Sequence, residues 1–408
     1  MRATYYLESC LNTRFVAEQI AREQSGGHSR SWGGISNRSR EANKAFVVSV
    51  DTVEARGNSL PLYHARPVNQ TFVGRSAARV VIDYENLTPD SGIVEILNVA
   101  LGECQHLAVV SALRLEDISL PVEPNPKFQG PPNFVDRLVA DFGRRSFVCA
   151  PIKPSGPLEP SEAAYLAYEA ALGGADIIKD DELSATHPEF DYAKRYRMVS
   201  AAISRTKNET GESKRYVANV ICPMVDLEKR IEAAMECGAD MLLVAPALQG
   251  QDVVSFLRTR VPETPIIVHG TYQTVASRLE SYGLSLALWL KIQRYAGASA
   301  AVLPSTFGSF GYSPTETSSF LEACANPIER FNQCLPLHSG SVSPATIPYL
   351  HKLSPGLPAG YTAGSAIFDH PEGPRTGARA MRTAVDHIKV PTDGPNIWVP
   401  IVEDGYAI

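Results

Sequence analysis

The sequence predicts two domains, an α+β domain followed by an α/β barrel. With 408 residues, the chain is longer than an ordinary single domain. Its first part follows the order strand, helix, strand, strand, helix, strand, whereas strands and helices alternate in the rest. Five prolines within 121–132 separate the two patterns. We therefore expect a first domain at 1–125, a linker and barrel entry at 126–145, and a barrel with a C-terminal tail at 146–408.

The composition is that of a soluble globular protein. Apolar residues make up 44% of the chain and charged residues 20%, and no apolar run of about 18 residues offers a membrane span. The net charge of -6, with scattered Lys and Arg, argues against a nucleic-acid surface. Residues 1–8 lack a signal core, so we expect a cytoplasmic protein. The seven cysteines form no Cys-x-x-Cys pair, which favours reduced thiols over a catalytic cysteine.

The first domain is predicted from the spacing of its apolar residues. Helical spacing occurs at 15–23 and 93–100. Segment 25–39 is rich in Gly and Ser and predicts a loop. Strand-like apolar patterns occur at 4–7, 45–50, 78–84 and 109–115. This order of elements is typical of a ferredoxin-like α+β domain.

The second domain is predicted to be a TIM barrel. Its strand candidates are 147–152, 175–178, 216–220, 241–245, 265–269, 300–303, 335–339 and 361–367. Helical segments are expected at 162–172, 192–206, 227–237, 252–257, 274–282 and 284–295. Strand and helix alternate over about 240 residues, which is the usual size of an eight-stranded α/β barrel.

The active site of such a barrel lies where the strands end, so polar residues at strand ends are the candidates. They are Lys153, Lys179, Asp181, Glu182, His269, Ser339, Gly340, Ser341, Gly364 and Ser365, the last two within the eighth strand candidate. We expect these residues to converge on one mouth of the barrel.

The acidic run 179–182 allows two interpretations. It could be a solvated turn in which Lys179 forms a salt bridge with Asp181. Alternatively, its carboxylates could hold Mg²⁺, which prefers hard oxygen ligands. The position at a barrel strand end favours the metal site. Asp180 points to the other side of an extended chain, so we leave it out of the metal shell.

Several motifs resemble the large subunit of ribulose-bisphosphate carboxylase/oxygenase (RuBisCO). They are Ile152-Lys153-Pro154, the run from Gly173 to Glu182, the run from Ala112 to Asp117, His269, His338-Ser339-Gly340 and Asp369-His370-Pro371. The resemblance spans nearly the whole chain and implies the RuBisCO large-subunit fold. It also implies that CO₂ converts Lys179 into a carbamate, which holds Mg²⁺ together with Asp181 and Glu182. Lys153 would then assist proton transfer at the enediolate stage, with His269 close to the metal.

The chain also departs from the carboxylase. Ser155 stands in place of a lysine, Gly270 in place of an arginine, and the loop lysine that meets CO₂ is replaced within Gly308-Ser309. Further departures fall at Val302, at Gly102-Glu103 and at His28-Ser29. A site without the loop lysine and without the arginine replaced by Gly270 cannot fix CO₂ on a bisphosphate. The chain is therefore most similar to the RuBisCO-like proteins called form IV.

The resemblance suggests where substrate binds. The Ser339-Gly340-Ser341 and Gly364-Ser365 segments could cradle one phosphate or a carboxylate, or be ordinary tight turns. Ser309 would lie in the loop after the sixth strand. The family further implies a homodimer with sites at the subunit interface, where Glu23, His28 and Glu103 would act across it.

We therefore expect an Mg²⁺-dependent lyase or isomerase that takes CO₂ as an activator. It would form an enediolate from a small ketose or oxo sugar acid, with or without one phosphate, by enolisation or decarboxylation. Lys153, Glu103 or His269 would move the proton. The alternatives are an enolase or isomerase of the methionine-salvage type, a transcarboxylase/hydrolase, and a non-catalytic regulatory homologue.

Overall fold

The computed structural model describes most of the chain as two compact units. The described residues are 1–25, 44–56, 75–85, 87, 91–119, 130–156, 158–184, 191–304, 306, 312–325, 332–354 and 356–388. The first unit contains Met1–Pro126 and Tyr272–Ile292, and the second contains Lys127–Thr271 and Gln293–Ile408. No helix among these described residues is long and apolar enough to cross a membrane. All but the first residue of the predicted loop at 25–39 and most of the proline-rich segment 121–132 lie outside the described residues.

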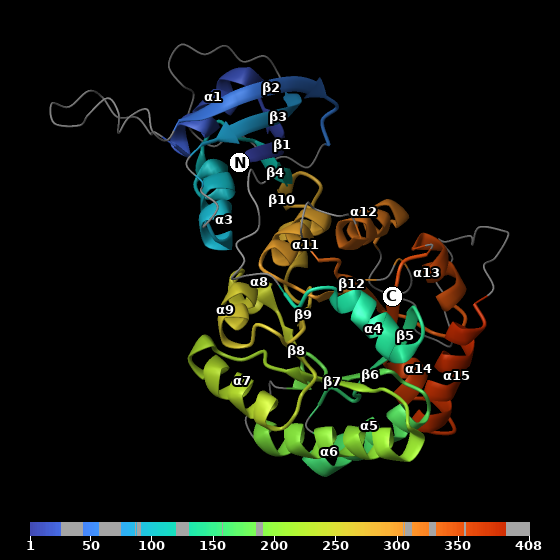
Figure 1. Ribbon diagram of the computed structural model, residues 1–408. Helices are drawn as coiled ribbons and strands as arrows, with labels where there is room; N and C mark the ends of the chain where they lie inside the picture. Colours follow the sequence, from blue (N-terminus) through green and yellow to red (C-terminus); the bar gives the residue numbers. More distant parts are fainter. Residues whose placement is uncertain are drawn as a thin grey trace. The chain divides into compact units, whose positions relative to one another are not determined.

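The first unit confirms the ferredoxin-like pattern and extends its sheet (Figure 1). The sheet has five strands in the order β10-β4-β1-β3-β2. Strand β1 pairs antiparallel with both β3 and β4, so the first strand of the chain lies inside the sheet. The elements are β1 (Arg2–Ser9), α1 (Thr13–Glu23), β2 (Ala45–Val53), β3 (Ser76–Tyr84), α3 (Ile93–Leu101), η1 (Cys104–His106) and β4 (Ala112–Ser119).

The fifth strand corrects one sequence expectation. A helix was expected at 274–282, but α10 covers only Thr274–Ser277 and β10 (Tyr282–Leu284) follows it. Strand β10 pairs in parallel with β4, so sheet hydrogen bonds satisfy its backbone. Gly283 has φ +73°, and a Cβ atom there would lie 1.9 Å from the Ala276 carbonyl oxygen. Only glycine fits at this position in the middle of β10, close to the end of α10.

The second unit is the predicted closed barrel of eight parallel strands. The order around the barrel is β11-β12-β13-β5-β6-β7-β8-β9. The strands are β5 (Ser146–Pro151), β6 (Ile177–Lys179), β7 (Arg215–Asn219), β8 (Met241–Val244), β9 (Ile266–Val268), β11 (Ala300–Pro304), β12 (Leu335–Ser339) and β13 (Ala359–Thr362). The eighth strand was expected at 361–367, but it ends at Thr362 and a short helix begins at Ser365.

Helices alternate with the barrel strands along the chain. They are α5 (Pro160–Leu172), α6 (Tyr192–Thr210), η4 (Met224–Asp226), α7 (Leu227–Glu236), α8 (Pro246–Gln249), α9 (Val253–Arg260), α11 (Leu286–Tyr295), α12 (Pro314–Ala325), α13 (Ile347–Leu353), α14 (Ser365–Phe368) and α15 (Pro374–Asp386). The expected helices at 162–172, 192–206, 227–237 and 284–295 are confirmed to within a few residues. Helix α8 was not expected, because its four residues are too few for a periodic pattern.

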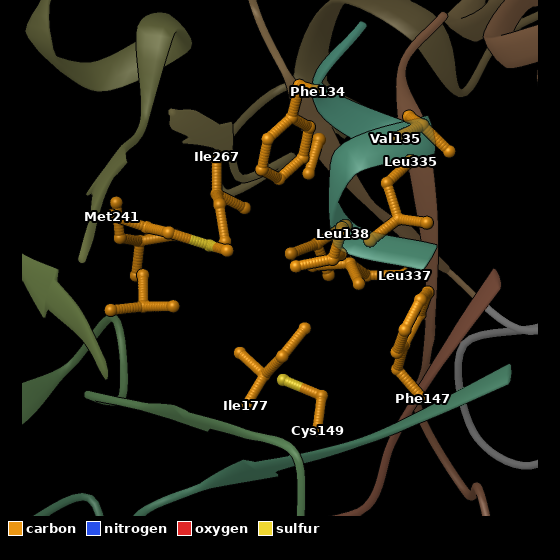
Figure 2. Close-up of a cluster of buried hydrophobic side chains, with 14 of the residues drawn as sticks. Phe134, Val135, Leu138, Phe147, Cys149, Ile177, Met241, Ile267, Leu335 and Leu337 are labelled. Carbon is orange, nitrogen blue, oxygen red and sulfur yellow. The ribbon is translucent and has the colours of Figure 1, made fainter. Parts of the chain in front are cut away.

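A helix that the sequence reasoning missed closes one end of the barrel. Helix α4 (Phe134–Phe142) lies in the segment expected to be linker and barrel entry. Figure 2 shows Phe134, Val135 and Leu138 of this helix beside strand residues such as Phe147 and Leu335. These strand residues stand at the beginning of their strands. The apolar core therefore fills the amino-terminal end of the barrel, and the carboxyl-terminal end is left for polar side chains.

Candidate active site

The strand-end residues predicted from the sequence come together around one cavity in the second unit. The cavity has a volume of about 620 Å³. Its lining includes Lys153, Lys179, Asp181, Glu182, His269, Ser339, Gly340, Ser341, Gly364 and Ser365. These residues follow five different strands, and parallel strands direct their carboxyl ends to the same mouth. The barrel geometry therefore gathers residues that are more than 200 positions apart in the chain.

Lys179 and Glu182 form a buried ion pair. Lys179 is the last residue of β6 and only 1% exposed. Its Nζ lies 2.9 Å from Glu182 Oε2 and donates a second hydrogen bond to the Asp180 carbonyl oxygen at 2.9 Å. Burial alone would lower the pKa of Lys179, but the charges of Glu182 and Asp181 outweigh it and raise that pKa. Burial alone would likewise raise the pKa of Glu182, but Lys179, followed by His269, holds it well below its usual range.

Lys153 and Asp181 form a second ion pair at the same cavity. Lys153 follows the end of β5 by two residues, and its Nζ lies 2.7 Å from Asp181 Oδ2. The same nitrogen donates to Ser155 Oγ at 2.6 Å. The other oxygen of Asp181 accepts the Leu183 backbone N–H at 3.0 Å. The side chain of Lys153 is 34% exposed and that of Asp181 only 1%, so the amine is the partner that reaches the open cavity.

His269 follows β9 directly and faces the same carboxylate. Its Nε2 lies 3.5 Å from Glu182 Oε2. Its Nδ1 accepts the Thr271 backbone N–H at 3.1 Å, so the neutral ring carries its proton on Nε2. Burial lowers the pKa of His269 to about 4. The ring is therefore a neutral hydrogen-bond donor toward the cavity at neutral pH.

Asp180 points away from this cavity, as the alternation of an extended chain predicts. Its Oδ1 accepts from Arg195 Nε at 2.9 Å and its Oδ2 from the Tyr216 hydroxyl at 2.7 Å. Both partners are almost completely buried. The central carboxylate of the acidic run therefore belongs to a structural ion pair outside the cavity.

Residues that follow two neighbouring strands, β12 and β13, add hydroxyl groups to the cavity lining. Ser339, Gly340 and Ser341 come from the end of β12, and Gly340 and Ser341 have φ angles of 86° and 52°. Gly364 and Ser365 come after β13 rather than within it, because the strand ends at Thr362. The lining residues that were not predicted are Pro151, Val342, Ser343, Ala345, Thr346, Thr362 and Ala366. Most of them lie within five residues of a strand end, so scanning the whole loops after the strands would have found them.

Four predicted residues are not brought to this cavity by the described structure. Glu23 and Glu103 belong to the first unit. Glu103 is exposed there and lies 2.7 Å from His106 Nδ1. His28 and Ser309 lie outside the described residues. The roles expected for these four residues remain predictions.

The donor set would suit a magnesium ion with Lys179 as a carbamate. No group of three His, Cys, Asp or Glu side chains that could hold a metal occurs among the described residues. Asp181 and Glu182 supply two carboxylates, and Lys179 Nζ lies beside Glu182 in the same cavity. A carbamate on this nitrogen would add a third hard anionic oxygen ligand, which fits the preference of Mg²⁺. The residues therefore fit the metal that the acidic run suggested.

Comparison with known proteins agrees with this geometry. The chain is 29% identical over 393 residues, 94% of its length and 88% of the relative's, to a ribulose bisphosphate carboxylase-like protein of Chlorobaculum tepidum. It is 28% identical to a 2,3-diketo-5-methylthiopentyl-1-phosphate enolase of Geobacillus kaustophilus, over 95% of this chain and 92% of the enolase. The crystal structure of a rubisco-like protein from Burkholderia fungorum superposes with a TM-score of 0.81 at 22% identity, covering 94% and 93% of the two chains. Residues 135–397 match the family model of the ribulose bisphosphate carboxylase large chain, catalytic domain. Because this match covers more than half of the chain, the protein belongs to the RuBisCO large-chain family.

Proposed function

We propose that this chain is an Mg²⁺-dependent enzyme that forms an enediolate from a small ketose or oxo sugar acid, by enolisation or by decarboxylation. One observation carries the proposal. The ion pairs Lys179–Glu182 and Lys153–Asp181, at 2.9 and 2.7 Å, meet at a single cavity of about 620 Å³. A binding protein has no need for two lysine–carboxylate pairs that each contain one almost fully buried charge, Asp181 or Lys179, because burying a charge is costly.

Lys179, as a carbamate, would hold the metal together with Asp181 and Glu182. Adding CO₂ to the Lys179 ammonium forms an N–C bond and releases two protons. The product places three anionic groups in one buried place, an arrangement that is unfavourable without a cation. Carbamate formation and Mg²⁺ binding should therefore strengthen each other reciprocally.

When bound, the metal would supply positive charge to stabilise the negative charge that develops on two neighbouring substrate oxygens. Lys153 is the group placed to move the proton, since its amine reaches the open cavity and is held by Asp181 and Ser155. His269 keeps its proton on Nε2 and would orient a substrate oxygen by donating a hydrogen bond. The hydroxyl groups at Ser339, Ser341 and Ser365 would bind the far end of the substrate, whether a carboxylate or a single phosphate.

A second candidate function is that of a 2,3-diketo-5-methylthiopentyl-1-phosphate enolase, because the Geobacillus kaustophilus relative with that name aligns with 95% of this chain. It shares the proton abstraction proposed here and differs in its substrate. The third candidate is a non-catalytic homologue. Carboxylation of ribulose bisphosphate is not expected, because Ser155 and Gly270 replace the basic residues that the resemblance calls for.

We further propose a homodimer with active sites at the subunit interface. Glu23, His28 and Glu103 of one subunit would then act at the cavity of the other. Light scattering on the purified protein tests the assembly, and a purely monomeric protein with full activity would refute this part of the proposal.

Calorimetric titration with Mg²⁺, with and without bicarbonate, tests the metal site. We expect tight binding only with bicarbonate, accompanied by proton release. A companion assay follows exchange of substrate protons with D₂O for a set of sugar acids and sugar phosphates. Equal Mg²⁺ affinity in the two titrations would refute the carbamate site. Bicarbonate-dependent Mg²⁺ binding without exchange or decarboxylation of any substrate would favour the non-catalytic homologue.

A further inference from the structure

Asn219 is a buried polar residue that contacts the acidic run from outside the cavity. It is the last residue of β7 and is 0% exposed. Its Nδ2 donates to the Asp181 carbonyl oxygen at 2.8 Å and lies 3.3 Å from that of Glu182. Its Oδ1 accepts the Ile221 backbone N–H at 2.8 Å. The side chain thus connects the turn after β6 to the turn after β7.

The Asp181 carbonyl oxygen is the centre of the turn that presents both carboxylates. Besides Asn219, it accepts the backbone N–H and the hydroxyl group of Ser184, at 3.1 and 2.7 Å. The ladder between β6 and β7 ends at Lys179, paired with Val217, and beyond it the backbone N–H of Asp180 still bonds to Val217. Beyond that bond, the Asn219 side chain joins β7 to the backbone at Asp181 and Glu182. Without it, the backbone at Asp181 and Glu182 would lose its side-chain link to β7.

We propose that Asn219 is a positioning residue for the metal site. By holding the carbonyl groups of Asp181 and Glu182, it fixes the direction in which their carboxylates enter the cavity. Its side chain does not line the cavity, so it acts through these residues rather than on substrate. The effect on Mg²⁺ affinity rests on the proposed function. The link between Asn219 and the turn at Asp181 can be measured without metal.

The expected magnitude follows from the behaviour of other metal sites. Residues that hydrogen-bond to metal ligands without contacting the metal typically contribute to affinity, and their removal weakens metal binding by about 10–100-fold. An Asn219→Ala variant should weaken bicarbonate-dependent Mg²⁺ binding by about that factor. Amide hydrogen exchange at Ser184 should also accelerate in the metal-free variant, because the turn around the Asp181 carbonyl loosens.

Tyr196→Phe is a matched control. The Tyr196 hydroxyl donates to the backbone carbonyl of Asn219, so the variant removes a buried hydrogen bond from the same residue without touching Asp181 or Glu182. We expect it to lower the melting temperature while leaving Mg²⁺ affinity and Ser184 exchange unchanged. If Asn219→Ala does not fold, Asn219→Ser is measured instead, since its shorter hydroxyl group cannot span both carbonyl groups.

The outcomes separate this inference from the proposed function. Weaker Mg²⁺ binding and faster Ser184 exchange in the Asn219 variant, but not in Tyr196→Phe, support the positioning role. Unchanged exchange with unchanged Mg²⁺ affinity overturns it, as does an equal effect in the control. If the unmodified protein binds no Mg²⁺ even with bicarbonate, the proposed function fails, and Ser184 exchange alone then decides the role of Asn219.

Discussion

Replacing Lys179 with methionine tests the centre of the site. The Lys179→Met change keeps a long unbranched side chain but removes the amine. No carbamate can then form, and Mg²⁺ would lose one of three protein ligands. Glu182 would also lose the ammonium that lies 2.9 Å from its Oε2. We therefore expect loss of both turnover and bicarbonate-dependent Mg²⁺ binding, together with a measurable loss of stability.

The size of the stability loss follows from the burial of the pair. Removing one partner of a buried ion pair costs about 3–5 kcal/mol. The Glu182 side chain is still 23% exposed, which favours the low end of that range. We expect a loss of about 3 kcal/mol in the free energy of unfolding at pH 7.

The pH dependence of this loss has a defined sign. Lys179 holds the pKa of Glu182 below its usual range, so the pair contributes stability above the unfolded pKa of about 4.3. That contribution is lost as the pH falls through the lower, folded pKa. In the variant, Glu182 becomes protonated on acidification and no longer needs a partner, so the difference between the two proteins should shrink toward pH 4.

Urea unfolding at pH 7 and at pH 4 measures this difference. The double variant Lys179→Met/Glu182→Gln is the control, because it removes both charges and should recover part of the loss. A single variant within about 1 kcal/mol of the unmodified protein at pH 7 would contradict the buried-pair reasoning. A single variant that retains bicarbonate-dependent Mg²⁺ binding would refute the carbamate site.

Three further predictions concern other parts of the chain. Lys153→Met should lower kcat by about 10²–10⁴-fold, and unchanged kcat would exclude Lys153 as the proton carrier. Glu103→Gln should lower turnover without lowering the melting temperature, since Glu103 is exposed; unchanged turnover would remove Glu103 from the mechanism. Burial lowers the pKa of His338 to about 4, whereas the unfolded histidine binds a proton near pH 6.5. The free energy of unfolding should therefore decrease by about 3 kcal/mol between pH 6.5 and pH 4. Urea unfolding of His338→Leu should lack this part of the pH dependence, whereas the exposed control His387→Gln should keep it.

Local patterns predicted most of the fold, and the exceptions have physical causes. Segment 274–282 has apolar residues at helical spacing, but pairing with β4 turns its end into β10. Segment 361–367 looks like one apolar strand, yet Gly364 and Ser365 leave the sheet and open α14. Helix α4 was overlooked because it follows a proline-rich segment, although its apolar residues fill the end of the barrel. For β10 and α4, a tertiary contact decided between two locally acceptable conformations.

The candidate site was predictable where barrel topology applies. Lys153, Lys179 and His269 each stand at a strand end, and the closed barrel places all strand ends at one mouth. The hydroxyl groups of Ser343 and Thr346 were not predicted because they lie deeper in the loop after β12, where no periodicity marks them. Asn219 gave no signal in the sequence, since a single asparagine after a strand is usually part of a turn.

The sequence by itself determined the alternation of strands and helices, and the placement of a lysine and two carboxylates at one strand end. Both follow from short-range order, because side-chain direction alternates along a strand and parallel strands end on the same side of a sheet. Only the tertiary structure decided which charges pair. Lys179 pairs with Glu182 rather than Asp181, Asp181 pairs with Lys153, and Asp180 turns outward to Arg195. These choices depend on the directions and separations of side chains over a few ångströms, which spacing along the sequence does not contain.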